Sequence, residues 1–470
     1  MDSINTIMKR PPIICHLALK RETLFIFLVA TYILIYDTVL IEPYSFYINY
    51  MVKLLVITSL FIFFRYQKMS GSQTIVVVLY SMLLMYGLLI ATLNHNQQFT
   101  LSFPLTLKYG LRILALIAIL MILNTNRYSD KIIKFPIWIG VILSIQSILL
   151  FIMISSGNAP EPDYINVRGP MRSYGIWGFA PSITWGYNNL FIPRVSSFFS
   201  ESSNFARFLE YPIILSLGYY KIYGGKRYFF SLAVCLMSFV LTFSLTGYLA
   251  LFLGFFVFYM LRTKNIPSKL FVLILCTLFI LSFHIYQKKT YINNPDQRTL
   301  IQHMLLSKYA DALRSPEDIR GLYGGRVYSA IEATKLFFEY PLGIGLLNNA
   351  DIDILNKYGE EGYTTIHLYG AFWFWLVKTG FVGISIIILI FYIVLRKMKT
   401  FWSDKKDIRT YVSIAFISIS IHQLITGDWM DPMFLFVMAL ILAYKKRNYE
   451  GKISKSYNYA QTPLKAVINA

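Results

Sequence analysis

Long apolar runs separated by polar connections fill most of the chain. Each run is roughly 17–25 residues long, the length that a helix needs to cross the hydrocarbon core of a bilayer. We expect helices rather than strands, because lipid offers no hydrogen-bonding partner to an open backbone. The pattern predicts twelve membrane-spanning helices near residues 24–41, 50–64, 73–93, 103–123, 132–154, 204–220, 228–244, 246–261, 270–286, 371–395, 410–426 and 429–444.

Basic residues alternate between the two sides of these predicted spans. The N-terminal tail, every second connection and the C-terminal tail hold more than half of the 44 Lys and Arg residues. The short opposite connections at 42–49, 94–102 and 427–432 hold none. Because cytoplasmic loops of membrane proteins are enriched in Lys and Arg, both termini are predicted to be cytoplasmic. The same bias accounts for the formal net charge of +20 without a nucleic-acid partner.

The composition and the connections together predict the domain organisation. With 56% hydrophobic and 14% charged residues, the chain falls outside the soluble globular class. We expect an all-α polytopic membrane domain over residues 23–444, a cytoplasmic tail at 1–22 and a second one at 445–470. Two long loops, 155–203 and 287–370, are predicted to face the periplasm and to carry the working surface. Apolar spacing predicts helices over 302–314 and 327–338 in the second loop.

Charged residues inside spans are costly and are therefore functional candidates. The direction of each span places all of them in the periplasmic half of the bilayer. Lys108 and Arg112 are spaced i, i+4 and share one helix face, whereas Arg207 and Glu210 are spaced i, i+3 and are a possible structural pair. A positive face opening to the outer leaflet suits a lipid-linked phosphate or pyrophosphate. The complete set is Asp37, Lys53, Lys108, Arg112, Arg207, Glu210 and Lys378.

The first long loop ends in the sequence IPRVSSFFSESSNFARFLEYP, which leads into the sixth predicted span. Arg194, Glu201 and Arg207 cluster here, and the residues at 202–204 are predicted to cap the N-terminus of the span. Ordinary capping with an interfacial arginine is the alternative to a binding role.

The second long loop holds the sequence GGRVYSAIEATKLFFEYPLGIGL. Arg326 is expected to open an amphipathic helix, which the turn at Pro341–Gly345 ends. His367 stands just before the tenth predicted span, where a hydrogen-bonded interface residue is the alternative to a catalytic base.

Taken together, residues 190–445 resemble the O-antigen polymerase and O-antigen ligase superfamily of bacterial inner-membrane glycosyltransferases. The resemblance rests on an Arg before a Phe-rich polar stretch, a Thr-Gly element in LTFSLTGYLALFLG, an Arg-helix-PLGIG segment, and a His followed by Gly380–Gly383. The order of these segments and the twelve-span topology agree with the family. The resemblance implies a GT-C-like membrane fold in the inner membrane.

The resemblance also implies a donor glycan on undecaprenyl pyrophosphate and roles for particular residues. Arg194 and Arg326 match the phosphate-binding positions, and Lys108, Arg112 and Arg207 are further candidates for binding the pyrophosphate. His367 lies near the position of the ligase histidine, but Leu368 follows it where ligases have a small polar residue, and Gly380 lies thirteen residues on. This departure favours a polymerase and makes Glu201 the alternative base.

We therefore expect a polysaccharide polymerase, with a ligase to the lipid A core or a flippase for lipid-linked sugars as alternatives. A transporter usually shows two related halves, and the sequence has no internal repeat. No metal or nucleotide cofactor is expected: the chain has no GxxxxGK[ST] loop, and the Asp351–Asp353 pair is interpreted as solvated loop. The expected partners are the lipid-linked oligosaccharide, the bilayer and a chain-length regulator, with no nucleic acid.

Overall fold

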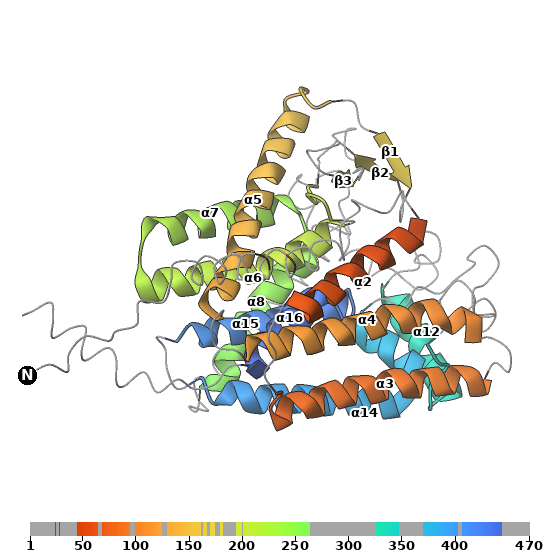
Figure 1. Cartoon of the computed structure of the whole chain (residues 1–470). Coiled ribbons are helices and arrows are strands. Elements are labelled where there is room, and N and C mark those ends of the chain that lie inside the picture. The colour runs from red at the N-terminus through yellow and green to blue at the C-terminus, as the bar shows by residue number, and fades with distance from the viewer. Residues whose placement is uncertain are drawn as a thin grey trace, which may run out of the picture.

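The fold is that of a helical bundle with a small sheet in one of its long connections (Figure 1). The computed structural model describes the single residues 24 and 28 and the ranges 45–63, 68–94, 99–124, 129–160, 163–166, 170–173, 179–181, 194–199, 201–263, 326–346, 370–402 and 407–443.

Six helices among the described residues are long and apolar enough to cross a membrane. They are α3 (Gly71–Asn94), α4 (Phe99–Leu123), α5 (Ser129–Ser155), α8 (Leu245–Arg262), α14 (Ala371–Lys399) and α15 (Ile408–Ile425). Each coincides with a predicted span, so this part of the prediction is confirmed.

Four further helices lie in predicted spans, but each is too short or not apolar enough over its described residues to count as a candidate span. They are α2 (Ser45–Phe63), α6 (Ser202–Tyr223), α7 (Lys226–Leu241) and α16 (Pro432–Ala443). The predicted spans at 24–41 and 270–286 lie outside the described residues, apart from residues 24 and 28. The twelve-span count and the cytoplasmic termini therefore stay predictions.

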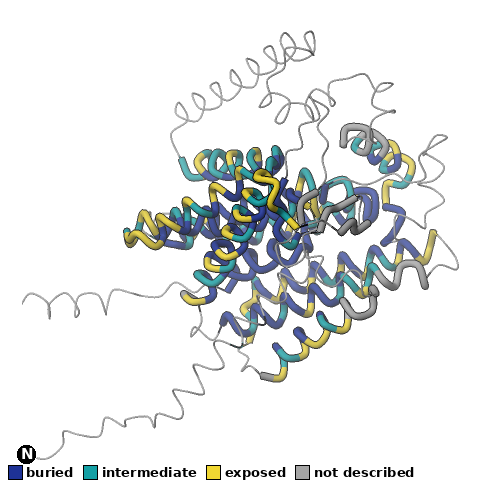
Figure 2. Tube along the Cα trace, turned by 90° about the horizontal axis from the view of Figure 1, so that it is seen from above, coloured by how far each residue is buried: buried dark blue, intermediate teal, exposed yellow. Residues whose placement is uncertain are grey.

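The helices pack in two groups that share α15. One group joins α3, α4, α14 and α16, and the other joins α6, α7 and α8, with α5 crossing α6 and α7 steeply (Figure 1). Helix α8 approaches α15 closely at Gly254, where an added Cβ would lie 2.6 Å from the Cβ of Ser418. Small residues at such crossings let helix backbones approach, which is how helices associate in lipid. Buried residues line the inner faces of the helices (Figure 2).

Three short antiparallel strands lie within the predicted loop 155–203. They are β1 (Asp163–Asn166), β2 (Pro170–Ser173) and β3 (Phe179–Pro181), paired in the order β1-β2-β3. No strands were predicted in this loop, whereas the other elements of the described residues are helices, as predicted. The strands are three or four residues long and include two prolines, so they carry no alternating apolar pattern by which to recognise them.

Helix α12 (Arg326–Glu339) confirms the helix predicted over 327–338, and the turn after it enters the bundle. Helix α14 breaks at Gly380, whose φ is +59°. The carbonyls of Val377 and Lys378 accept from the N–H groups of Ile344 and Gly345, each at 2.9 Å. In return, the N–H of Phe381 donates to the carbonyl of Pro341. The break lies nine residues into α14, about 13 Å from its first residue at 1.5 Å per residue.

The far side of this inserted turn contacts α3. The N–H of Leu346 donates to the carbonyl of Gly87 at 3.0 Å, and the hydroxyl of Tyr86 donates to the carbonyl of Leu342. Non-helical backbone is tolerated at membrane depth only where protein surrounds it and satisfies its polar groups. The turn is therefore a fixed element that joins α12 to α3 and α14.

Candidate functional site

The candidate site lies at the end of the bundle where α3 and α15 end and α4, α6 and α14 begin, hereafter the loop end. Helix α15 ends at Ile425 and α16 begins at Pro432. The connection between them, residues 426–431, carries Asp428 and Asp431, and we name it the carboxylate turn. Both carboxylates form ion pairs with arginines from helices far away in the sequence.

Asp428 joins α4 to α14. One carboxylate oxygen lies 2.5 Å from Nη1 of Arg112, and the other accepts from the indole N–H of Trp375 at 3.3 Å. Burial would raise the pKa of Asp428, but the charges of Arg112 and Lys108 hold that pKa below its ordinary value. The carboxylate is therefore ionised at neutral pH, and its contribution to stability is lost only as the pH falls through the depressed pKa.

Asp431 pairs with the second arginine and caps a helix. One of its oxygens accepts from Nη2 of Arg207 at 3.0 Å, and the other accepts from the N–H of Met433 at 2.9 Å in the first turn of α16. Pro432 follows at the first helical position, where its missing N–H costs no bond. Both side chains of the pair are about 4% exposed. Gln423 completes the network, because its side-chain oxygen accepts from Asp428 N–H at 2.5 Å and from Arg207 Nη1 at 3.4 Å.

A second buried polar cluster connects α6 to α15. The carboxylate of Glu210 lies 2.5 Å from Nδ1 of His422 and accepts from the hydroxyl of Ser418 at 2.7 Å. Neither side chain of the Glu210–His422 pair is more than 1% exposed. The sequence suggested that Arg207 pairs with Glu210. In the structure, Arg207 pairs with Asp431 and Glu210 pairs with His422. Although Arg207 and Glu210 are three residues apart, Glu210 contacts α15 and Arg207 contacts the carboxylate turn.

Arg194 is buried, with 7% exposure, against the turn between α7 and α8. Its Nε donates to the carbonyl of Thr242 at 3.1 Å, and the N–H of Val195 donates to the carbonyl of Leu241. Ser197 has a φ of +51°, and its hydroxyl donates to the side-chain oxygen of Gln146 at 2.7 Å. The segment around Arg194 is therefore held by α5 and by the C-terminal end of α7.

Glu201 is exposed and occupies the N-cap position of α6. Its side chain makes no capping bond to the backbone, and instead accepts from the hydroxyl of Ser203 at 3.0 Å. The predicted capping by residues 202–204 is wrong, because α6 already begins at Ser202 and its N-cap position is therefore Glu201. The carboxylate is left facing solvent seven residues from Arg194.

Of the remaining predicted residues, the structure describes some and leaves others outside the described ranges. Lys108 lies 5.7 Å from the Tyr109 ring, on the same helix as Arg112. Arg326 begins α12, while His367 and the Asp351–Asp353 pair lie outside the described residues, as does the helix predicted over 302–314. Helix α14 begins at Ala371, close to the end of α15, since a Cβ on Gly370 would lie 2.3 Å from the carbonyl of Leu424.

Sequence reasoning missed Asp428, Asp431 and Gln423 of the network, and His422 of the second cluster. For the two aspartates, the available signal was the presence of two acidic residues in a short connection without basic residues, while two predicted spans carry arginines.

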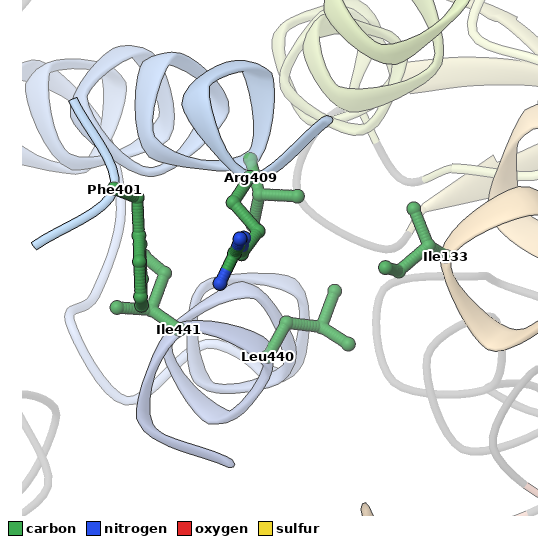
Figure 3. A pocket seen from close by; sticks show the side chains of 6 residues that line it. Ile133, Phe401, Arg409, Leu440 and Ile441 are labelled. Carbon is green, nitrogen blue, oxygen red and sulfur yellow. The ribbon is translucent and has the colours of Figure 1, made fainter. Parts of the chain in front are cut away.

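A narrow pocket lies at the opposite end of α15 from the carboxylate turn (Figure 3). The guanidinium of Arg409 lies 5.0 Å from the Phe401 ring, and it also forms an ion pair with Asp407. The pocket contains none of the predicted site residues. Its lining consists of Ile133, Phe401, Arg409, Val412, Leu440 and Ile441.

The fold and the buried charges define a multi-pass helical membrane protein whose polar network is concentrated at the loop end. The sequence profile of the O-antigen ligase family matches residues 230–388. This match confirms the resemblance to the O-antigen polymerase and ligase superfamily, and it includes Arg326 and His367 but not Arg194 or Asp428. No curated protein matches the chain significantly.

Proposed function

We propose that the protein is a surface-polysaccharide polymerase, which transfers a growing glycan from undecaprenyl pyrophosphate to the next lipid-linked repeat unit at the periplasmic face of the inner membrane. The observation that carries this proposal is that segments of the resemblance meet in pairs. Residues 194 and 195 hydrogen-bond to 242 and 241, and residues 341–345 hydrogen-bond to 377–381. The profile match to the O-antigen ligase family supports the same class of reaction.

In the proposed reaction, a hydroxyl of the acceptor sugar attacks the anomeric carbon of the donor. The new glycosidic bond forms as the bond between that carbon and the pyrophosphate oxygen breaks, and undecaprenyl pyrophosphate leaves. The hydroxyl proton passes to a general base, either Glu201 or His367. Arg194 and Arg326 neutralise the charge that develops on the leaving pyrophosphate, a task for which guanidinium groups need no metal.

Three further basic residues, which the sequence assigned to pyrophosphate binding, receive a different role here. Lys108, Arg112 and Arg207 were expected to bind pyrophosphate directly. Arg112 and Arg207 are each ion-paired with a carboxylate, so we assign direct binding first to Arg194 and Arg326. Lys108 then adds positive potential behind the phosphate site, whereas Arg112 and Arg207 hold the two carboxylates in place.

A ligase that transfers glycan to the lipid A core is the second candidate, because the matching family is named for that activity. The sequence around His367 favours the polymerase, since Leu368 replaces the small polar residue expected of a ligase. A flippase for lipid-linked sugars is the candidate of another class. If the protein is a polymerase, we expect a chain-length regulator as its protein partner.

Gel analysis of surface polysaccharide in a deletion strain separates the three functions. A single repeat unit on the core indicates a polymerase, loss of all attachment indicates a ligase, and lipid-linked units held in the inner leaflet indicate a flippase. In a complemented strain, Arg194→Ala and Arg326→Ala are each expected to abolish long chains while the protein still inserts. Arg227→Ala, an exposed arginine at the start of α7, is the matched control. Normal chain ladders in both site variants would overturn the proposal.

A further inference from the structure

The two carboxylates of the carboxylate turn differ in surroundings. Asp431 is about 4% exposed and caps α16 through two backbone N–H groups. Asp428 is about 20% exposed, while its partner Arg112 is about 4% exposed. Asp431 therefore caps a helix, whereas Asp428 is more exposed to solvent than its partner Arg112.

Asp428 is held from several directions at once. Its own N–H donates to Gln423, and one of its carboxylate oxygens accepts from the N–H of Met430 at 3.0 Å. The same oxygen accepts from Trp375 of α14, and the opposite oxygen meets Arg112 of α4. The carboxylate therefore has one fixed orientation between α4 and α14.

Aromatic packing reinforces the same junction. The ring of Tyr109 lies 5.3 Å from the Trp375 ring, and the guanidinium of Arg112 lies 5.0 Å from the Tyr109 ring. Arg112 is therefore bounded by an aromatic face and by the Asp428 carboxylate. A buried ion pair adds little net stability, and its best-attested use is to specify register between elements.

Of the two helices that Asp428 connects, α4 carries cations of the proposed site, and α14 binds the turn that follows α12, the helix that Arg326 begins. Helix α4 carries Lys108 on the same face as Arg112, and α14 begins four residues after His367. Neither Glu201 nor Arg194 contacts Asp428 in the interactions described above. The register between α4 and α14 therefore sets the distance between the α4 cations and the turn that anchors α12, the helix that Arg326 begins.

We propose that Asp428 is a positioning residue of the transfer reaction, which acts through Arg112 and Trp375 to hold the loop ends of α4 and α14 in register. This inference rests on the proposed function. Transfer requires the donor pyrophosphate and the acceptor hydroxyl to be aligned, and misplacement by about 1 Å is enough to cost roughly a hundredfold in rate. Groups that orient a site from behind have effects of this kind without contacting substrate.

The test compares Asp428→Asn with Asp407→Asn in the full-length protein. Asp407 is a matched control, because it lies at the other end of α15, accepts from a backbone N–H and pairs with Arg409. Polymer is measured per folded protein in the complemented deletion strain and, with purified enzyme, as kcat and KM for the lipid-linked repeat unit. We expect Asp428→Asn to lower kcat/KM by about tenfold or more, Asp428→Glu to restore part of it, and Asp407→Asn to leave it unchanged.

A purely structural role predicts a different result. In that case Asp428→Asn lowers the amount of folded protein and its thermal stability, and raised expression restores polymer in full. That result, or wild-type kcat/KM in Asp428→Asn, overturns the inference. If Asp428→Asn does not accumulate, Trp375→Phe decides, because it removes the N–H donor to Asp428 and keeps an aromatic ring against Tyr109. We expect a several-fold fall in kcat/KM, and an unchanged value overturns the inference.

The two proposals fail in different ways. Normal ladders in Arg194→Ala and Arg326→Ala reject the proposed function whatever Asp428 does. Loss of ladders in those variants together with normal Asp428→Asn activity rejects only the positioning role.

Discussion

Substituting Gly345 by Ala tests whether the inserted turn after α12 is the fixed element that the hydrogen bonds indicate. Gly345 has a φ of +94°, and an added Cβ would lie 2.3 Å from the Cα and 2.4 Å from the N of Ala91 in α3. Left-handed backbone costs a residue with a Cβ about 1–2 kcal/mol. Overpacking against backbone adds about 1–3 kcal/mol, because backbone atoms do not move aside easily.

The total expected loss is therefore about 2–5 kcal/mol in the free energy of unfolding. Gly224→Ala is the matched control, because Gly224 has a φ of +68° but no atom within 4 Å of its added Cβ. It reports the cost of a positive φ without crowding, at about 1–3 kcal/mol. Thermal denaturation of purified protein in detergent ranks the two variants against wild type.

Because the turn anchors α12, Gly345→Ala is also expected to shorten the surface polysaccharide, whereas Gly224→Ala is not. The reasoning is refuted if Gly345→Ala melts at or above the temperature of Gly224→Ala. It is also refuted if Gly345→Ala is destabilised but the folded fraction makes chains of normal length, since α12 and Arg326 would then not depend on the turn.

Two further predictions concern titratable side chains. Glu201→Gln and His367→Ala should separate the candidate bases in the same polysaccharide assay, with a loss of roughly 100-fold or more in the variant that lacks the base; equal activity in both would exclude both residues. His422→Leu should destabilise the protein by about 3 kcal/mol, because it leaves the buried Glu210 carboxylate without its partner. The double variant Glu210→Gln/His422→Leu should then lose less than the sum of the two single losses in denaturation measurements, and strict additivity would argue against a coupled pair.

The helices of the fold were predictable because their signal is local. A run of apolar residues the length of the bilayer core identifies a span by itself, and α3, α5 and α14 lie within a few residues of the predicted bounds. The amphipathic spacing of α12 was equally readable. The strands at 163–181 were not, since they are too short to show a period of two.

The candidate site was predictable only in part because its partners are distant in the chain. The charges of Arg112 and Arg207 pointed to a functional end of the bundle, but their partners lie 316 and 224 residues away. Spacing within one helix indicates which side chains share a face and says nothing about what another helix places opposite. The i, i+3 spacing of Arg207 and Glu210 therefore suggested a pair, while packing gave each residue another partner.

The long separation of the ion-paired residues also affects how the protein is made. A ribosome adds about 5–20 residues per second, so the 316 residues between Arg112 and Asp428 take roughly 15–60 s to synthesise. During that interval α4 and α6 enter the bilayer before the carboxylates that will neutralise them exist. A chain that stops before residue 426 contains Arg194, Arg326 and His367 but lacks the carboxylates that pair with Arg112 and Arg207. The last helical hairpin, α15–α16, thus completes the charge balance of helices inserted much earlier.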